Sequence, residues 1–148
     1  CEVSKVAIRN AKKNKRIKKI VEYKNGRIPL KDNSCDIVFC IKSLSAIRVD
    51  SFETALKELH RVLKPNGFFF IVDFLHTDGD ASNEVEINDQ KVHAVKPDWI
   101  DVPLLHFTIE NSEILLKSKT VAKELMNLES YNGNPYPGFM ALMQFREE

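Results

Sequence analysis

Residues 36–74 read DIVFCIKSLSAIRVDSFETALKELHRVLKPNGFFFIVDF, and this stretch decides the fold. Its two ends, 36–41 and 68–74, are short apolar runs rich in β-branched and aromatic residues. Runs that are apolar on both faces are typical of strands buried in a parallel sheet. Between them, apolar residues recur at the spacing of one helical face: Phe52, Ala55, Leu56, Leu59, Val62 and Leu63. The stretch therefore predicts one βαβ unit.

The helix of this unit has boundary signals at both ends. Asp50 stands three residues before Glu53, a spacing that predicts an N-terminal capping pair. Pro65, Asn66 and Gly67 follow the apolar positions. Proline cannot continue the helical hydrogen bonding, and glycine tolerates the positive φ that a turn into the next strand needs. We expect these three residues to end the helix.

The residue identities in this region are more informative about the protein family than the spacing of its apolar residues. Residues 28–40 read IPLKDNSCDIVFC, and residues 55–74 read ALKELHRVLKPNGFFFIVDF. Together they resemble the class I methyltransferases that use S-adenosylmethionine, especially the broad type 11 group. The matching positions are Ile28, Pro29, Asp32, Asn33, Ser34, Asp36, Arg61, Val62, Leu63, Lys64, Pro65, Gly67 and Asp73. The resemblance extends over roughly the first three quarters of the chain.

The resemblance implies an α/β, Rossmann-like methyltransferase fold with a mostly parallel sheet and a C-terminal antiparallel hairpin. Residues 120–131 and 139–146 are the expected strands of that hairpin, joined by the turn-rich residues 132–137. Residues 107–116 resemble the helix that precedes the family's sixth strand. Residues 20–23 are the expected third strand.

Two further segments have predicted roles. Residues 77–90 are polar and acidic and are expected to form a mobile loop, which in the family varies with substrate and often acts as a lid. Residues 6–19 are expected to form a helix, with Ser4 as its cap.

The family's glycine-rich cofactor loop has no counterpart in this sequence. None of the five glycines forms a G-x-G motif: Gly26, Gly67, Gly79, Gly133 and Gly138. The chain opens at Cys1, without methionine, and almost at once enters a predicted helix. We therefore expect residues 1–148 to be a single methyltransferase-like domain that is N-terminally truncated and lacks the first strand and the glycine loop.

The resemblance implies S-adenosylmethionine as cofactor and assigns it to particular positions. Glu2 stands where the family's acidic residue binds the two ribose hydroxyls, which one carboxylate can accept together; a frayed terminal glutamate is the alternative. Lys24, Asn25 and Gly26 stand where the family holds the adenine amino group, with the Asn25 oxygen in place of an aspartate. Ile41 ends the strand that leads into the methyl-transfer site.

Three residues are candidates for the chemistry of methyl transfer. Lys42 and Ser43 begin the loop in which many family members carry a histidine or aspartate, although a purely structural loop is an equal alternative. His76 follows the second strand of the unit, at the carboxyl edge where open α/β sheets bind ligands. It is a candidate general base or substrate contact. A loop histidine without a catalytic role is the alternative.

The composition indicates an ordinary globular protein. Hydrophobic residues make up 43% of the 148 residues, charged residues 29%, and the net charge is +1. The net charge gives no whole-chain argument for nucleic acid or a membrane, and no apolar run is long enough to cross a bilayer. We predict a cytoplasmic protein. Cys1, Cys35 and Cys40 lack C-x-x-C spacing, and the D-G-D at 78–80 completes no calcium loop, so no metal site is expected.

One charged stretch stands out against this balance. Residues 9–19 contain seven lysines and arginines and no acid. A phosphate-binding stripe is one interpretation, and the solvated outer face of a helix lying on a sheet is the other. No aromatic residue is interleaved with the cations, so base recognition has little support.

Two functions from different classes follow. In the first, the protein is an S-adenosylmethionine-dependent methyltransferase with an unidentified acceptor. In the second, it is an inactive methyltransferase-like domain that serves as a protein-interaction scaffold, similar to the amino-terminal domain of anamorsin, an iron–sulfur assembly protein. In both cases the strand at 36–41 should have an exposed edge, which we expect a missing segment, a partner chain or a second copy to cover.

Overall fold

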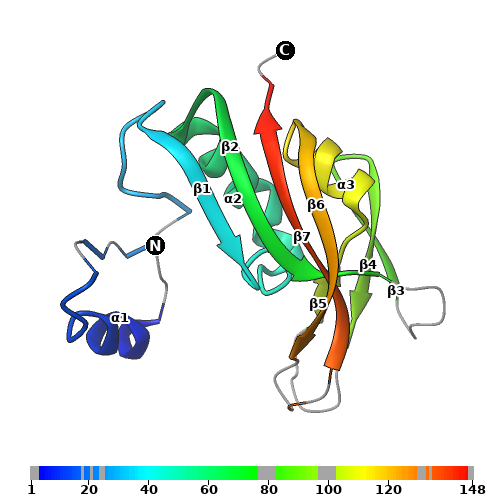
Figure 1. Cartoon of the computed structure of the whole chain (residues 1–148), viewed down its shortest axis with the longest axis horizontal. Helices are drawn as coiled ribbons and strands as arrows, with labels where there is room; N and C mark the ends of the chain where they lie inside the picture. Colours follow the sequence, from blue (N-terminus) through cyan, green and yellow to red (C-terminus); the bar gives the residue numbers. More distant parts are fainter. Residues whose placement is uncertain are drawn as a thin grey trace.

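The computed structural model describes residues 4–17, 19, 20, 22, 23, 26–76, 83–96, 103–129, 133 and 135–146. They form helices α1 (Lys5–Ala11), α2 (Val49–Val62) and α3 (Ile109–Leu115) and strands β1 (Cys35–Ile41), β2 (Leu63–Phe74), β3 (Asn83–Ile87), β4 (Gln90–Val95), β5 (Leu104–His106), β6 (Ser118–Glu129) and β7 (Pro135–Phe145). A four-stranded sheet has the order β1-β2-β7-β6, and a smaller sheet has the order β3-β4-β5 (Figure 1).

The predicted βαβ unit is confirmed. β1 and β2 are parallel, with Ile37 opposite Phe68. α2 packs the buried Phe52 and Leu56 against one face of the sheet. The capping prediction was wrong, because α2 begins after Arg48 without a side-chain cap and Asp50 lies in the first turn. The Asp50 carboxylate instead pairs with the Arg48 guanidinium at 2.8 Å.

The passage from α2 into β2 is tighter than expected. β2 begins at Leu63, directly after the helix, rather than at residue 68. The positive φ falls on Asn66, at 60°, and not on Gly67. Gly67 is needed for space, since a Cβ there would lie 2.8 Å from Leu63 Cδ1 and 2.9 Å from the Lys64 carbonyl oxygen.

The C-terminal antiparallel hairpin is confirmed as β6 and β7, with β7 inserted between β6 and β2. β7 starts at Pro135, inside the segment predicted as a turn. The ladder between β2 and β7 ends at the pair Phe74 and Gly138, so the missing N–H of Pro137 lies beyond it. The Pro137 carbonyl still accepts a hydrogen bond from the Leu75 amide at 3.0 Å.

The polar stretch at 83–90 is not a loop. It forms most of a hairpin between β3 and β4, turned by Asn88 and Asp89 with φ of 48° and 60°. Two successive positive φ values are typical of a tight hairpin turn. Residues 77–82, which include the D-G-D motif, lie outside the described residues.

The predicted N-terminal elements are shorter than expected. Ser4 caps α1 by accepting a hydrogen bond from the Ala7 amide at 3.3 Å, as predicted. However, α1 ends at Ala11 instead of continuing to residue 19. Lysines and arginines spaced four apart in 12–19 repel one another on a helix, which opposes continuation. The described residues of 20–23 form no strand.

The core lies on one face of the four-stranded sheet. There α2, the end of α3 and the small sheet pack around Phe69, Ile71 and Phe139. The opposite face is open at β1, where Ile37, Phe39 and Ile41 are 39%, 61% and 57% exposed. In the described part of the chain, no helix has the length and apolar character needed to span a membrane.

Candidate functional site

The carboxyl ends of β1 and β2 meet at one edge of the sheet, because the two strands are parallel. This edge brings together the loop that holds Lys42 and Ser43 and the residue His76. The Lys42 amide donates to the Val72 carbonyl at 2.7 Å. The His76 amide donates to the Phe107 carbonyl at 3.0 Å. The structure therefore places the three candidate catalytic residues around neighbouring strand ends.

A buried carboxylate organises the loop after β1. Asp73 is fully buried, and its Oδ2 accepts hydrogen bonds from the amides of Leu44 and Ser45, both at 3.1 Å. Its Oδ1 accepts from the Phe74 amide at 2.9 Å. Burial raises the pKa of Asp73, while these hydrogen bonds act in the opposite direction. Asp73 is a positioning residue that sequence reasoning did not select, although it is the only acid in the run FFFIVDF.

Lys42 lies at the carboxyl edge and also forms a hydrogen bond to a distant strand. Its backbone has a positive φ of 47°, and its Nζ donates to the Glu129 carbonyl at the end of β6, at 2.9 Å. The ammonium thus links the loop after β1 to the end of β6, the other edge strand of the sheet. Ser43 is exposed. Beside it, burial raises the pKa of the Cys40 thiol to about 12, so Cys40 is a buried thiol and not a nucleophile.

His76 is accompanied by histidines of the small sheet. Its ring stacks on His93 of β4, with centroids 3.3 Å apart and planes 3° from parallel. His93 lies opposite His106 of β5, whose Nδ1 is 3.3 Å from the Tyr136 hydroxyl. Sequence reasoning missed His93, His106 and Tyr136 because they lie on three separate strands, β4, β5 and β7, which only the tertiary fold brings together. Among the described residues, no group of three side chains is placed to hold a metal ion.

The adenine side of the predicted cofactor site is only partly visible. Glu2, Lys24 and Asn25 lie outside the described residues. Gly26 has a φ of 70°, and a Cβ there would lie 2.9 Å from Thr54 Cγ2 of α2. The glycine is therefore required by the backbone conformation and by the close approach of α2.

The segment after Gly26 is fastened to α2 by Arg61. The Arg61 guanidinium donates to the carbonyls of Ile28 and Leu30 at 2.8 and 2.9 Å, and to Asp32 at 2.6 Å. It also pairs with Glu58 at 2.7 Å. These two carboxylates raise the pKa of Arg61. Arg61 thus connects the I-P-L-K-D segment to the helix of the βαβ unit.

Glu58 completes the same network. Its Oε2 accepts a hydrogen bond from the Ile28 amide at 2.7 Å. The hydrogen bonds from Arg61 lower the pKa of Glu58 to about 2, with burial acting in the opposite direction. Both the amide and the carbonyl of Ile28 are therefore bound by one ion pair, which fixes the course of the chain as it approaches β1.

Comparison with known proteins shows which proteins this chain resembles. The chain superposes on a methyltransferase from Methanosarcina mazei, described as S-adenosylmethionine-dependent, with a TM-score of 0.73 over 99% of this chain and 81% of that one, at 19% identity. The family model described as "Methyltransferase domain" matches residues 1–71. That match covers just under half of the chain, and the superposition shows that the chain has the fold of S-adenosylmethionine-dependent methyltransferases. The α/β fold expected from the resemblance is confirmed.

Other methyltransferases share the fold. The 1,6-didemethyltoxoflavin-N1-methyltransferase of Burkholderia thailandensis, solved with S-adenosylhomocysteine, has a TM-score of 0.62 at 16% identity over 99% of this chain and 59% of its own. A curated relative, the sterol 4-C-methyltransferase strm-1 of Caenorhabditis elegans, is 29% identical over 116 residues. That match covers 78% of this chain and 34% of strm-1, so this chain spans about a third of the length of that relative.

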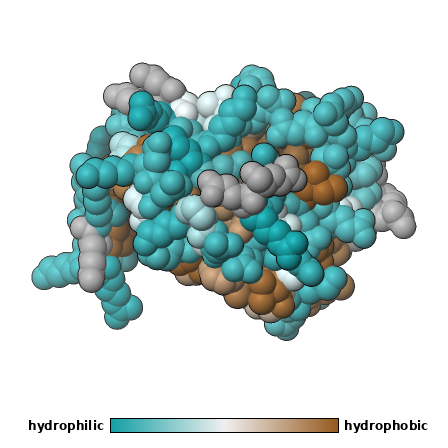
Figure 2. All heavy atoms as spheres, turned by 90° about the horizontal axis from the view of Figure 1, so that it is seen from above, coloured by the Kyte–Doolittle hydropathy of each residue, from teal (hydrophilic) through white to brown (hydrophobic). Residues whose placement is uncertain are grey.

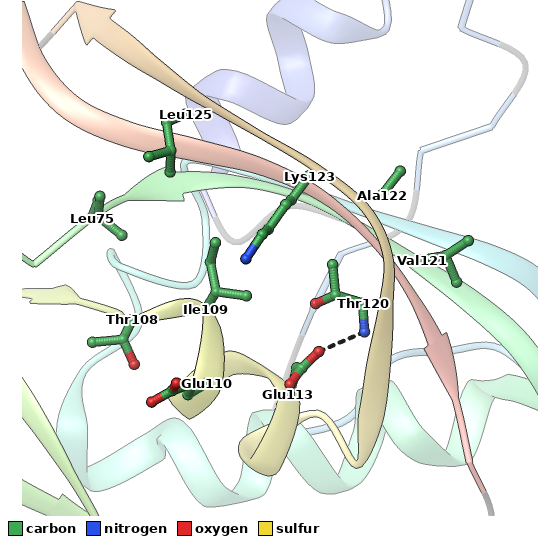
Figure 3. Close-up of a pocket in the computed structure, with 10 residues that line it drawn as sticks. All are labelled: Leu75, Thr108, Ile109, Glu110, Glu113, Thr120, Val121, Ala122, Lys123 and Leu125. Carbon is green, nitrogen blue, oxygen red and sulfur yellow. Dashed lines mark hydrogen bonds between the residues drawn. The ribbon is translucent and has the colours of Figure 1, made fainter.

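The methyltransferase fold also has an open groove between α3 and β6, with a volume of about 720 Å³ (Figure 3). None of the predicted site residues lines it. Its lining consists of Leu75, Thr108, Ile109, Glu110, Glu113, Thr120, Val121, Ala122, Lys123 and Leu125. Figure 3 shows the Lys123 side chain reaching toward Ile109, across from Glu110 and Glu113. Leu75 directly precedes His76, so one end of the groove adjoins the carboxyl edge.

Proposed function

We propose that the protein transfers a methyl group from S-adenosylmethionine to an acceptor, and that this chain supplies the β1–α2–β2 part of the site. The observation that carries the proposal is the loop after β1, which Asp73 holds through the amides of Leu44 and Ser45. Methyl transfer is an in-line displacement that depends on alignment of the reacting atoms. Because the buried Asp73 carboxylate holds the backbone of this loop, the loop can fix the position of the reacting groups.

Two observations support a cofactor site at this edge. Ile41 presents an exposed apolar side chain beside the loop, and the Arg61 network holds the segment that follows Gly26. We propose Ile41 and Gly26, together with Glu2, Lys24 and Asn25, as the residues that contact S-adenosylmethionine. When bound, the cofactor supplies an electrophilic methyl group on a sulfonium. The chain's own part is to fix the position of that group and to shield it from water.

We propose His76 as the residue that accepts the acceptor's proton. Its backbone is held by Phe107 and its ring by the stacked His93, so its orientation is set from two sides. General bases act when they are within hydrogen-bond reach of the proton. Lys42 and Ser43, on the facing loop, are the proposed acceptor contacts.

An apolar acceptor is the class that we favour. The strm-1 relative is described as a sterol 4-C-methyltransferase. In this chain, the groove that adjoins His76 is lined by Leu75, Ile109, Val121 and Leu125. An elongated hydrocarbon body could lie along that groove while its reactive end reaches the carboxyl edge.

Calorimetric titration with S-adenosylhomocysteine tests the proposed cofactor site. We expect micromolar binding to the 148-residue chain and an affinity several-fold lower for Ile41→Ser, which removes the apolar contact. Phe39→Ser is the matched control, because Phe39 is equally exposed on the same face of β1 but lies away from the edge. Equal losses for the two variants would contradict the proposed placement of the cofactor.

The scaffold function remains the second proposal. It is supported by the absence of a G-x-G motif from the sequence. If neither this chain nor the full-length gene product binds S-adenosylhomocysteine, the protein is a methyltransferase-like scaffold. A cytoplasmic location, a single domain over 1–148 and N-terminal truncation stay predictions under both proposals.

A further inference from the structure

The near-neutral charge of the whole chain hides a strong segregation of charge. Residues 4–20 hold eight of the 22 lysines and arginines and none of the 21 acidic residues. The other residues therefore contain 14 basic against 21 acidic side chains. A basic segment joined to an acidic body indicates a partner that carries negative charge.

The structure leaves this basic segment accessible. α1 has no buried residue, and it stands apart from the two sheets (Figure 1). In the described part of the segment, no lysine or arginine forms an ion pair with an acidic side chain. Hydrophilic side chains cover the left side of the molecule in Figure 2, the side on which α1 lies in Figure 1. The cations are therefore available to an external anion.

Apolar side chains are exposed among the same cations. Val6 is 62% exposed and Ile17 is 42% exposed. Lysines and arginines with exposed aliphatic side chains between them are typical of segments that lie on a lipid surface, where the cations meet headgroups and the apolar groups enter the interface. Nucleic acid has less support, because residues 4–20 contain no aromatic side chain on which a base could stack.

We propose that residues 4–20 dock the protein onto the anionic surface of a lipid membrane. Clusters of four to eight lysines and arginines beside a bilayer are attracted to phosphatidylserine and phosphoinositide headgroups. α1 is too short to hold the protein by apolar burial alone, so the attachment is mainly electrostatic and reversible. Docking of residues 4–20 on the membrane does not depend on the cofactor site. It would bring the protein to the lipid bilayer, in which the apolar acceptor of the proposed function dissolves.

Sedimentation with vesicles tests the proposal on the 148-residue chain. We expect binding to vesicles of phosphatidylcholine with phosphatidylserine, weak binding to phosphatidylcholine alone, and loss of binding as salt rises above about 0.15 M. The variant Lys12→Gln/Lys13→Gln/Arg16→Gln should bind roughly a hundredfold more weakly, since each cation near the surface contributes about fivefold in affinity. Ile17→Ser should cause a smaller, salt-independent loss.

The matched control neutralises three exposed lysines outside the segment: Lys31→Gln/Lys57→Gln/Lys96→Gln. It should leave vesicle binding within about twofold, because these lysines belong to the acidic body. Equal losses for the two triple variants would overturn the proposal, as would equal binding to both vesicle types. Tighter binding to single-stranded RNA than to vesicles would also overturn it. S-adenosylhomocysteine binding, measured separately, keeps a failure here distinct from a failure of the proposed enzyme activity.

Discussion

The two edge strands of the four-stranded sheet differ in how they meet solvent. β6 carries Lys119, Lys123 and Glu124 along its length and has a register shift between Thr120 and Ala122. β1 has no charged residue from 37 to 41. Charges and bulges are the usual protection of an exposed sheet edge. β6 is therefore built as a permanent edge, whereas β1 has the composition of an interior strand.

This difference distinguishes an edge that is protected from pairing from one that is open to it. The outer edge of β1 has no strand beside it among the described residues, and its exposed face is apolar. We propose that this edge is covered in the working protein, and that in the isolated chain a second copy covers it. The predictions that follow alter one edge or the other.

Gly138→Ala should have the largest effect, because Gly138 lies in β7 between its partners Phe74 of β2 and Met126 of β6. A Cβ at position 138 would collide with the Leu128 side chain and lie 3.0 Å from the Asp73 carbonyl oxygen. We expect a loss of about 3 kcal/mol in unfolding free energy, or roughly 10 °C in Tm.

Gly133→Ala is the comparison for that variant. Gly133 has a φ of 83° but no atom within 4 Å of its added Cβ, so its substitution should cost only about 1 kcal/mol. If the two alanines cost the same by thermal unfolding, close packing of β7 is not what fixes β6.

Phe39→Lys would give β1 the kind of charge that β6 has. We expect two copies of the chain to associate through β1, and we expect this variant to associate at least tenfold more weakly, because burial of a phenylalanine contributes about 2 kcal/mol. Sedimentation equilibrium measures both. Leu125→Lys changes an equally exposed apolar residue on β6 and should leave association unchanged. A wild-type chain that is monomeric at high concentration would contradict this use of β1.

Glu58→Gln tests how the segment before β1 is held. The pKa of Glu58 is lowered from 4.5 to about 2 in the folded protein. Its contribution to stability is therefore fully present above about pH 4.5 and is lost as the pH falls toward 2. Urea unfolding should show the variant to be less stable than wild type at pH 7, with the difference disappearing near pH 2. A difference that is independent of pH would mean that the carboxylate charge is unimportant.

Lys123→Leu should have the smallest effect. It removes one of the charges that protect β6, so it should raise self-association, by about two- to threefold, in the same sedimentation experiment. Lys57→Leu on the exposed side of α2 is the control for added apolar surface. Equal increases in both variants would show that the position on the edge does not matter.

The βαβ unit could be predicted from the sequence because it is encoded locally: the period of the apolar residues in α2 is visible within a short window. The terminal hairpin was expected from the family resemblance, and the turn-rich residues 132–137 agreed with it only in part, because β7 starts at Pro135. The hairpin of β3 and β4 was missed because its turn is Asn88-Asp89, without glycine, and because the acidic residues around it were interpreted as a loop. The alternation of Val85 with Ile87 was the available signal.

The candidate site was predictable in its location and less so in its residues. Lys42, Ser43 and His76 were selected because they follow strands, and the structure places them at one edge. Asp73 and His93 act there through contacts that connect distant parts of the chain, at Ser45 and at His76 respectively. Such contacts leave no periodic pattern in a single sequence.

The Arg61 network has a consequence for how this protein can evolve. Arg61 binds the carbonyls of Ile28 and Leu30, and Glu58 binds the Ile28 amide, so most of the contacts reach the backbone. Side chains along that segment can therefore be exchanged while the path of the chain is kept. Natural variants could retune ligand preference beside β1 one residue at a time, provided that Glu58 and Arg61 change together or not at all.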